Sequence, residues 1–482
     1  MSGKLTTIDT HAQGTEKPRP SNFDGHRAPE KSLLADCVHC GFCLPACPTY
    51  MMWNEEMDSP RGRIYMMDRA AAGEMPLNET FQRHMDNCLG CMACMTACPS
   101  GVQYSKLIED TRGQVERHVK RGLGDSLFRR MLFATFPHPA RLRRLAPLLR
   151  FYQQKGLQKL VRSSGVLNKL PKRMAAMEAL LPVVPVERKP LPGVIPAAGA
   201  PRRRVGMLTG CVQSVFFSRV NEATARVLAA EGCEVIVPED QPCCGALMLH
   251  SGLDDPAAAM ARRIIEIFER AGVDTVVINS AGCGSTMKEY GHLLRDDPAW
   301  AERARAFSAK CRDISEIVCE LEPQAPRYSL RFRVAYHDAC HLRHAQGVWR
   351  EPRAALRKIP GLEIAEIAEP SLCCGSAGVY NLLHPEPAME LGDRKVENLL
   401  AANAEALVSA NPGCLLQLMA GLRRRGLKTL PTFHMVELLD ASIRGVTTWE
   451  LLWNRDKDET GGDAESRKLH ALPGNSWIGK TE

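Results

Sequence analysis

Eight of the 19 cysteines stand in two short runs of identical spacing. CVHCGFCLPACP is repeated 51 residues later by CLGCMACMTACP, and the cysteines are Cys37, Cys40, Cys43 and Cys47, then Cys88, Cys91, Cys94 and Cys98. In each run, three cysteines at two-residue gaps place three thiolates around one tight loop. The fourth follows a longer gap, precedes a proline and points away from that loop. Thiolates at this density bind soft metal ions, so both runs are candidate metal sites.

The spacing favours iron–sulfur clusters over zinc. C-x2-C-x2-C-x3-C-P is the run of two-cluster ferredoxins, in which the fourth cysteine binds the other cluster. Zinc sites also use C-x2-C pairs, but they need no displaced fourth thiolate, twice in the same register. We therefore predict two [4Fe–4S] clusters, one held by Cys37, Cys40, Cys43 and Cys98, the other by Cys88, Cys91, Cys94 and Cys47. Two neighbouring clusters form an electron relay, and no catalytic residue is predicted on this chain.

A second set of cysteines belongs to an internal duplication. RVGMLTGC, QPCCGA and TVVINSAGC recur as RVAYHDAC, SLCCGSAG and ALVSANPGC, with offsets of 129 to 131 residues between corresponding cysteines. A constant offset at three landmarks indicates a repeated structural unit. The repeated cysteines are Cys211, Cys243, Cys244 and Cys283 in the first copy, and Cys340, Cys373, Cys374 and Cys414 in the second.

These repeated cysteines are candidates for a redox or cluster site. In each copy short β-branched runs alternate with helix-length stretches, which predicts βαβ units with parallel strands. Cysteines at the strand ends would meet at the carboxyl edge of the sheet, where such folds bind ligands. The alternative is that buried cysteine is simply a small hydrophobic residue. That alternative suits Cys233, Cys311 and Cys319, which have no counterpart in the other copy.

Three histidines stand close to one of the repeated cysteines. His337, His341 and His344 flank Cys340 in YHDACHLRHAQG. Histidines near a cluster can tune it or relay protons, and a structural role is the alternative.

Length and composition indicate the number of domains, the class of protein and its location. At 482 residues, the chain predicts two or three domains, and its 45% hydrophobic and 24% charged residues are typical of a soluble globular protein. The first residues lack the apolar segment of a secretory signal, and no run approaches 18 apolar residues. We therefore expect a cytoplasmic location, with or without contact to the inner face of the cytoplasmic membrane. In a reducing compartment, many cysteines indicate metal or redox chemistry rather than disulfides.

Positive charge is concentrated in one segment. Residues 141–204 contain 15 Lys or Arg and two acidic residues, whereas the whole chain has a net charge of +7. Before the Pro-rich stretch LPVVPVERKPLPGVIPAAGAPRRR, Leu and Phe mix with Arg at roughly helical spacing. Such a basic amphipathic region suits an anionic membrane surface or an acidic partner, and a solvated helical connector is the alternative. No nucleic-acid-binding motif accompanies the charge, so nucleic acid is not expected as a partner.

The predicted fold is α/β, with an N-terminal helical ferredoxin-like domain and a C-terminal pair of duplicated βαβ modules. The predicted divisions are a flexible N-terminus, the helical two-[4Fe–4S] domain, a basic Pro-rich helical linker, two Cys-Cys-Gly modules and a polar tail, at residues 1–29, 30–120, 121–203, 204–325, 326–445 and 446–482.

This order of parts resembles the iron–sulfur subunit of glycolate oxidase, from about residue 33 to residue 440. The resemblance rests on CVHCGFCLPACPTY, DSPRGRIY, CPSGVQY, ATARVLAAEGCEV, CCGALMLH, AGCGSTMKEYG, HDACHLRHAQG and LCCGSAGVYNLLHP. It implies an electron-transfer subunit of a flavin-dependent 2-hydroxyacid dehydrogenase complex. The FAD would then lie on a partner subunit that oxidises glycolate to glyoxylate, and this chain would pass electrons towards a quinone or membrane acceptor.

The Cys-Cys-Gly module by itself is less specific. It also occurs in lactate-utilisation proteins, anaerobic glycerol-3-phosphate dehydrogenase and heterodisulfide reductases, which leaves an iron–sulfur subunit of those dehydrogenases or a thiol/disulfide enzyme as alternatives. Heterodisulfide reductase modules end in C-x-x-C, but here Ser280 and Asn411 occupy the first position of that pair. The missing cysteines count against a thiol/disulfide enzyme. They leave open an ordinary [4Fe–4S] cluster in each half, one shared cluster, or none.

Overall fold

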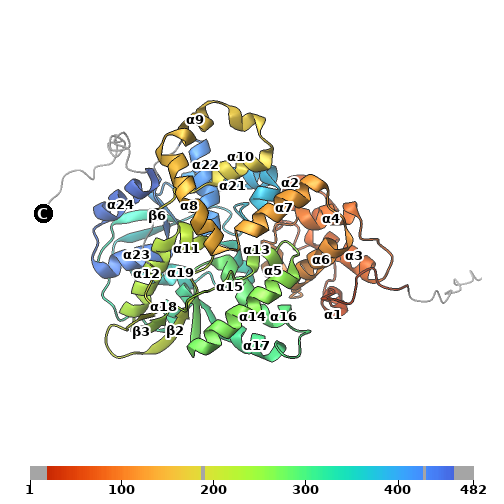
Figure 1. Cartoon of the computed structure of the whole chain (residues 1–482), viewed down its shortest axis with the longest axis horizontal. Coiled ribbons are helices and arrows are strands. Elements are labelled where there is room, and N and C mark those ends of the chain that lie inside the picture. Colours follow the sequence, from red (N-terminus) through yellow and green to blue (C-terminus); the bar gives the residue numbers. More distant parts are fainter. Residues whose placement is uncertain (1–18, 186–189, 427–429, 461–482) are drawn as a thin grey trace, which may run out of the picture.

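The computed structural model describes residues 19–185, 190–426 and 430–460 (Figure 1). The predicted flexible N-terminus and polar tail therefore lie largely outside the described residues, as does a short part of the Pro-rich stretch. Among the described helices, none combines the length and the apolar character needed to cross a membrane.

The N-terminal part of the chain is a small helical domain, drawn in red and orange at one side of the molecule (Figure 1). Its helices are α1 (Lys31–Ala35), α2 (Pro48–Trp53), η1 (Glu56–Asp58), α3 (Pro60–Ala71), α4 (Glu79–Asn87), α5 (Ala93–Ala97) and α6 (Tyr104–His118). Proline opens both α2 and α3, and the Ser59 hydroxyl accepts a hydrogen bond from the Gly62 amide, which caps α3. The helices enclose a core that includes Met67, Phe81 and Leu107.

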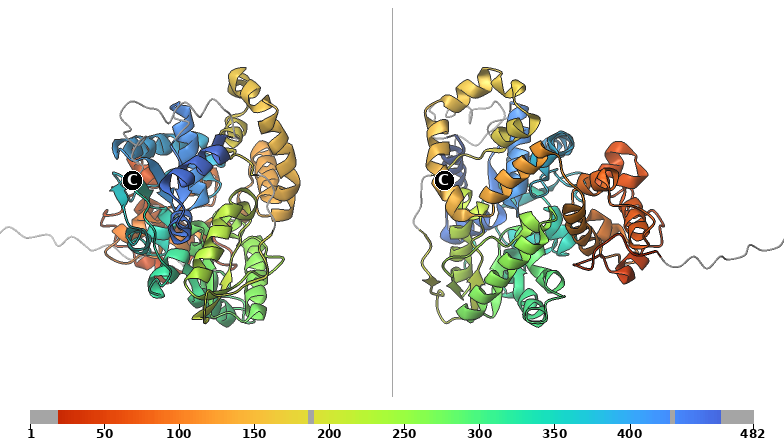
Figure 2. Two further views of the ribbon diagram at one scale, coloured as in Figure 1. Left: turned by 90° about the vertical axis from the view of Figure 1, so that its left-hand side faces the viewer. Right: turned by 45° about the vertical axis from the view of Figure 1, so that its right-hand side comes forward.

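A helical arm follows this domain and runs along the modules (Figures 1 and 2). It comprises α7 (Leu123–Thr135), α8 (Pro139–Gln154), α9 (Leu157–Ser163), η2 (Val166–Lys169) and α10 (Lys172–Leu180). Helix α8 lies on α11 (Val212–Phe216), α10 lies on α20 (Tyr380–Leu383) and α22 (Pro412–Arg424), and the α9 end of the arm projects outward. Leu142 is the one buried residue of α8, and α9, η2 and α10 bury none. The arm is therefore mostly surface, although it contains many apolar side chains.

Two α/β modules form the rest of the molecule, and their sheets have the same order. The first contains β1 (Val194–Ile195), β2 (Arg203–Met207), α11 (Val212–Phe216), α12 (Ser218–Ala230), β3 (Cys233–Ile236), α13 (Ala246–Leu249), α14 (Asp254–Ala271), β4 (Thr275–Ile278), α15 (Ala281–Lys288), α16 (Tyr290–Leu293), α17 (Ala301–Lys310), β5 (Cys311–Asp313) and α18 (Ile314–Glu320). The second contains β6 (Phe332–His337), η3 (His341–Ala345), α19 (Glu351–Arg357), β7 (Leu362–Glu366), α20 (Tyr380–Leu383), α21 (Pro385–Ala401), β8 (Ala406–Ser409), α22 (Pro412–Arg424), β9 (Thr432–His434), α23 (Met435–Arg444) and α24 (Thr448–Thr460).

The strand orders are β1-β3-β2-β4-β5 and β7-β6-β8-β9, and every pair except β1/β3 is parallel. The predicted parallel βαβ modules are confirmed. The Pro-rich stretch adds one feature that its composition does not predict, because Val194 and Ile195 form the antiparallel edge strand β1. In each sheet the first parallel strand, β2 or β6, lies between its two successors, so the chain reverses its direction of winding there. Such a switch point is where open α/β sheets bind ligands.

The two modules pack on one another and share one hydrophobic core, to which Val205 of β2 and Val334 of β6 both belong. Helices α12 and α23 pack together, and Arg226 pairs with Asp440 through two hydrogen bonds of 2.8 Å. The N-terminal domain docks on the modules through α6. There the Arg112 guanidinium donates to the His250 carbonyl oxygen over 2.8 Å.

Candidate metal centres

The first predicted ligand set lines one surface pocket. Cys37, Cys40 and Cys43 from the first loop and Cys98 from the second line this pocket together. Gly41 has a φ of +90°, which lets the loop curl back on itself at this point. The chain thus brings the displaced fourth cysteine of the second run beside the three cysteines of the first, as the ferredoxin spacing predicts.

The second predicted ligand set is buried. The four residues of this set are buried between α2, α5 and the loop that precedes α5, and they are Cys47, Cys88, Cys91 and Cys94. Burial raises the pKa of Cys91 and Cys94 well above the usual range for a thiol, and neighbouring cysteines raise both further. Converging buried thiols become thiolates only when a cation lies among them, so this donor set fits a metal cluster.

Two buried arginines, Arg63 and Arg112, lie next to the second predicted ligand set. The sequence by itself did not indicate their role. The Arg63 guanidinium donates to Asp58 over 3.0 Å and to the Thr49 hydroxyl over 3.2 Å. Arg112 donates to the backbone oxygen of Cys88. Although burial opposes the shift, Arg63 and Arg112 lower the pKa of the Cys88 thiol. Arg63 lies in the conspicuous DSPRGRIY stretch, but nothing local to that stretch shows that it faces a cysteine 25 residues away.

In the first α/β module the four repeated cysteines meet at the carboxyl edge of the sheet. Cys211 follows β2, Cys243 and Cys244 follow β3, and Cys283 lies in α15 after β4. The Sγ atoms of Cys211 and Cys243 are 3.5 Å apart, and Cys283 adjoins Cys244.

The second module repeats this arrangement. The Sγ atoms of Cys340 and Cys373 are 3.9 Å apart, and Cys414, on α22 after β8, adjoins Cys374. Contacts with Cys373 and Cys414, and then with His337, lower the pKa of Cys374 well below the usual range. Each set of four thiols therefore converges within its own module.

The glycine after each cysteine pair has a structural reason. Gly245 and Gly375 both have a φ of +85°, a conformation that favours glycine. A Cβ atom at Gly375 would lie 3.0 Å from the Cα atom of Ala388 on α21, and closer still to its carbonyl oxygen. In addition, the Gly375 amide donates to the Cys373 Sγ over 3.4 Å. The glycine thus lets the cysteine pair approach α21 closely.

Ser280 and Asn411 face each other across the module interface. Each occupies the position where a C-x-x-C pair would have its first cysteine. The side-chain oxygens of Ser280 and Asn411 lie 3.4 Å apart. Asn411 also donates through Nδ2 to the Cys414 Sγ over 3.3 Å. Asn411 therefore contacts the second set of thiols as a hydrogen-bond donor.

The cysteines without counterparts have ordinary structural surroundings. Cys233 and Cys311 are fully buried, at the first residues of β3 and β5. Cys319, on α18, donates to the backbone oxygen of Glu351 over 3.4 Å.

The three flanking histidines have different surroundings. His337 ends β6 and lies beside Cys374 and Cys414. His341 contacts the Cys340 Sγ through Nδ1 over 3.6 Å, and its ring lies 4.9 Å from that of His250. The Nδ1 atom of His344 shares a hydrogen bond of 2.8 Å with the Thr96 hydroxyl, which ties the second module to α5.

One contact joins the N-terminal domain to the second module. Leu89, Cys91 and Ala93 from the second cysteine loop belong to the same hydrophobic cluster as Cys340, Leu372 and Cys373. Burial is the largest cause of the raised pKa of Cys91, and the neighbouring thiol of Cys340 is the second largest. The second ligand loop thus lies directly against the thiols of the second module.

Three family models match four parts of this chain. The model for the 4Fe-4S dicluster domain matches residues 33–102, and the model for the cysteine-rich domain matches residues 205–288 and 334–419. Residues 124–181, which form most of the arm, match the model for the linker region of the glycolate oxidase iron–sulfur subunit.

Relatives match over most of the length. The probable glycolate oxidase iron–sulfur subunit of Bacillus subtilis (strain 168) is 41% identical over 85% of this chain and 94% of its own. This chain belongs to the family of glycolate oxidase iron–sulfur subunits. The subunit of that family from Escherichia coli (strain K12) is 36% identical over 86% of this chain and 95% of its own. Lactate utilization protein A of Exiguobacterium is 30% identical, but over only 50% of this chain and 98% of its own. Iron–sulfur clusters as the cofactors, and a place in an oxidoreductase complex, follow from these matches.

Proposed function

We propose that this chain is the electron-transfer subunit of a complex that oxidises glycolate to glyoxylate on an FAD-binding partner subunit. The similarity to glycolate oxidase iron–sulfur subunits over 85% and 86% of this chain supports this substrate. The lactate-utilisation relatives span only half of the chain, so they do not account for its complete set of parts. The domain divisions predicted from the sequence form part of the proposal.

The proposed electron relay depends on the contact between the second cysteine loop and the second module. We propose that Cys37, Cys40, Cys43 and Cys98 hold one cluster, that Cys47, Cys88, Cys91 and Cys94 hold the next, and that the cysteines of the second module form a third redox site. When bound, the clusters supply one-electron carriers. The shared hydrophobic cluster around Cys91 and Cys340 excludes water between the second and third sites and holds them side by side. Cluster ligation by the first module stays open within this proposal.

The exposed end of the relay lies at the first cysteine loop. Val38 and Phe42 are 67% and 66% exposed beside the thiols of the first set, and Trp53 and Tyr65 are exposed as well. Exposed apolar side chains next to a redox centre favour docking of an electron-transfer partner. We assign this surface to the flavoprotein subunit, because it leaves only the loop itself between the partner and the first cluster.

The basic arm forms a separate surface, which we assign to an anionic membrane or acidic partner near the electron acceptor. Leu145, Leu148 and Phe151 are exposed on α8 among Arg143 and Arg144, so the helix presents apolar and cationic side chains together. A purely solvated connector does not require exposed leucine and phenylalanine, whereas an amphipathic surface helix does. A quinone in that membrane is the proposed acceptor.

The third redox site is tested by Cys373→Ala in the assembled complex. Loss of this thiol leaves the eight ferredoxin-type cysteines in place, so both cluster signals in electron paramagnetic resonance should persist. Glycolate-driven transfer of electrons through the complex to a quinone should fall by at least tenfold. Cys311→Ala is the control, because that thiol has no counterpart in the repeat, is buried at the first residue of β5 in the first module, and its loss costs only packing energy. Equal transfer by both variants would make the second module structural and leave a relay of two clusters.

A further inference from the structure

His337 is a buried histidine whose ring interacts with a thiol and with no other polar group of the described residues. It is the last residue of β6 and is 1% exposed. Among the described residues, neither its Nδ1 nor its Nε2 atom has a nitrogen or oxygen hydrogen-bond partner, and its ring interacts with the Cys374 thiol. Buried polar atoms are nearly always hydrogen-bonded, because water otherwise binds them better. The fold thus holds an imidazole inside the second module and surrounds its nitrogens with thiols rather than with ordinary hydrogen-bond partners.

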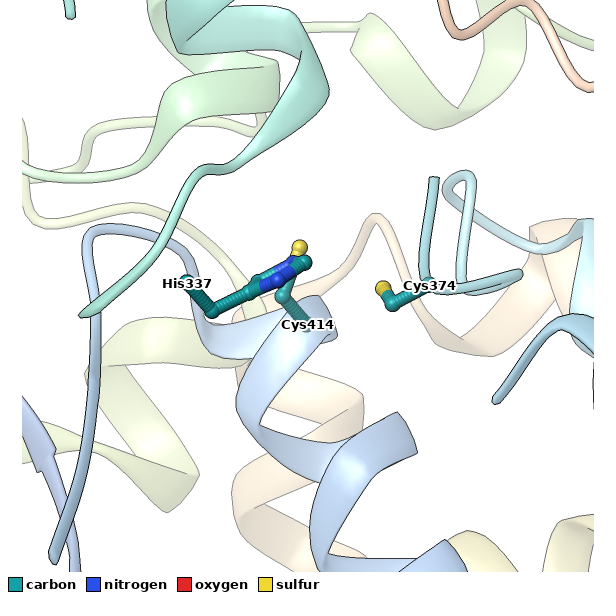
Figure 3. A group of neighbouring side chains, drawn as sticks. All are labelled: His337, Cys374 and Cys414. Atoms are coloured by element: carbon teal, nitrogen blue, oxygen red, sulfur yellow. The ribbon is translucent and has the colours of Figure 1, made fainter. Parts of the chain in front are cut away.

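The ring of His337 is directed at thiols. One of its nitrogens and the Sγ atoms of Cys374 and Cys414 all lie within 4.8 Å of one another. Figure 3 shows the imidazole extending from the end of β6 towards the Cys414 sulfur, with the Cys374 sulfur directed at the ring from the opposite side. The three residues come from three segments, the end of β6, the loop after β7 and the start of α22. Their convergence therefore arises from the tertiary fold and not from a local motif.

The first module provides an internal comparison. In RVGMLTGC the residue that corresponds to His337 is Leu208, three positions before Cys211 as His337 is before Cys340. Leu208 is also buried, at 2% exposure. The strand end therefore accepts an apolar side chain, so the fold itself does not require histidine. The second module has a nitrogen donor where the first has none.

We propose that His337 is a ligand in the second module and completes a five-donor site with Cys340, Cys373, Cys374 and Cys414. This inference rests on the third redox site proposed above and adds the identity of its fifth ligand. Five donors exceed the four of a tetrahedral zinc site, so a cluster with several iron atoms suits the set. Asn411, which replaces the first cysteine of a C-x-x-C pair, contacts Cys414 as a hydrogen-bond donor, and His337 supplies the remaining ligand instead.

This ligation has a consequence for the reduction potential. An imidazole ligand is neutral, whereas a thiolate adds a negative charge that disfavours the reduced state of the cluster. Histidine in place of cysteine accordingly raises the potentials of iron–sulfur clusters. The third site should therefore have a higher reduction potential than the same site with five thiolates.

The experiment uses the full chain, purified without oxygen and poised so that the third site is paramagnetic. Pulsed electron paramagnetic resonance should show the hyperfine coupling of a directly bound nitrogen, and labelling the histidines with ¹⁵N should convert it to a ¹⁵N coupling. The two all-cysteine clusters provide an internal standard within the same sample. His337→Leu, which copies the first module, and His337→Cys should both abolish the coupling.

A second readout of His337→Cys and one control variant keep the outcomes distinct. His337→Cys should retain the iron of the third site and lower its midpoint potential, so lost coupling does not depend on a site that fails to assemble. His434→Asn is the control, since His434 is a buried histidine that caps α23 and asparagine is a good N-cap residue. The control should keep the coupling unchanged.

A third-site signal without nitrogen coupling would overturn the ligand assignment and leave the proposed redox site standing. Absence of any third signal or additional iron would overturn both. Stoichiometric zinc that is lost in His337→Leu would overturn the iron–sulfur assignment.

Discussion

The glycine of the second Cys-Cys-Gly motif offers a sharp test of how the module positions its thiols. Gly375→Ala introduces a Cβ atom into a residue with a φ of +85°, and that conformation costs an L-residue about 1–2 kcal/mol. The new atom also lies 3.0 Å from the Cα atom of Ala388, inside normal contact distance. Overpacking of this kind adds about 1–3 kcal/mol. Together we expect a loss of about 3 kcal/mol, with displacement of Cys373 and Cys374 from α21.

Gly378→Ala is the matched control. Gly378 also has a positive φ, +69°, but its Cβ would meet only the tip of the Leu247 side chain at 3.5 Å. It should therefore lose only the conformational part, about 1 kcal/mol after the reduced entropy of the unfolded chain is counted. Thermal unfolding of the anaerobic protein should show a clearly larger drop in midpoint for Gly375→Ala, accompanied by lost iron. Equal midpoints and equal iron content would refute the close-approach explanation of this glycine.

Three further predictions concern charge. If the arm binds an anionic surface, association of the chain with phosphatidylserine vesicles should weaken as salt rises, since charges are screened over about 10 Å at 0.1 M; salt-independent sedimentation would favour a solvated connector. Arg63→Met should lower the midpoint potential of the second cluster in a redox titration, because a buried positive charge near Cys88 is removed; an unchanged potential would contradict this role. Burial raises the pKa of Glu109 from its usual value of 4.5 to about 7, so the stability that its protonated carboxyl contributes is fully present below pH 4.5 and is lost as the pH rises to 7; thermal midpoints should fall between about pH 4.5 and 7, and less so in Glu109→Gln.

The grouping of the cysteines and the duplication could be predicted from sequence because both are encoded by spacing. A C-x2-C-x2-C run constrains a loop directly, so the neighbours of Cys37 and Cys88 follow from a dozen residues each. A fixed offset between repeated cysteines likewise indicates two equivalent modules. Alternation of β-branched runs with helical stretches then gives parallel strands, whose carboxyl ends share one edge. These are local or periodic properties of the sequence. The matching strand order of the two sheets agrees with the predicted duplication.

Contacts between distant segments were decided only by the tertiary structure. No pattern around Cys91 indicates that it packs against Cys340, because that contact depends on how α6 docks on the modules. Arg63 reaches the surroundings of Cys88 only after α3 and α4 have packed together. His337 could be recognised from sequence as a neighbour of a cysteine, but the direction of its ring towards Cys374 and Cys414 requires β6, β7 and α22 to be in place. Spacing determines which residues can share a loop, and packing determines which loops meet.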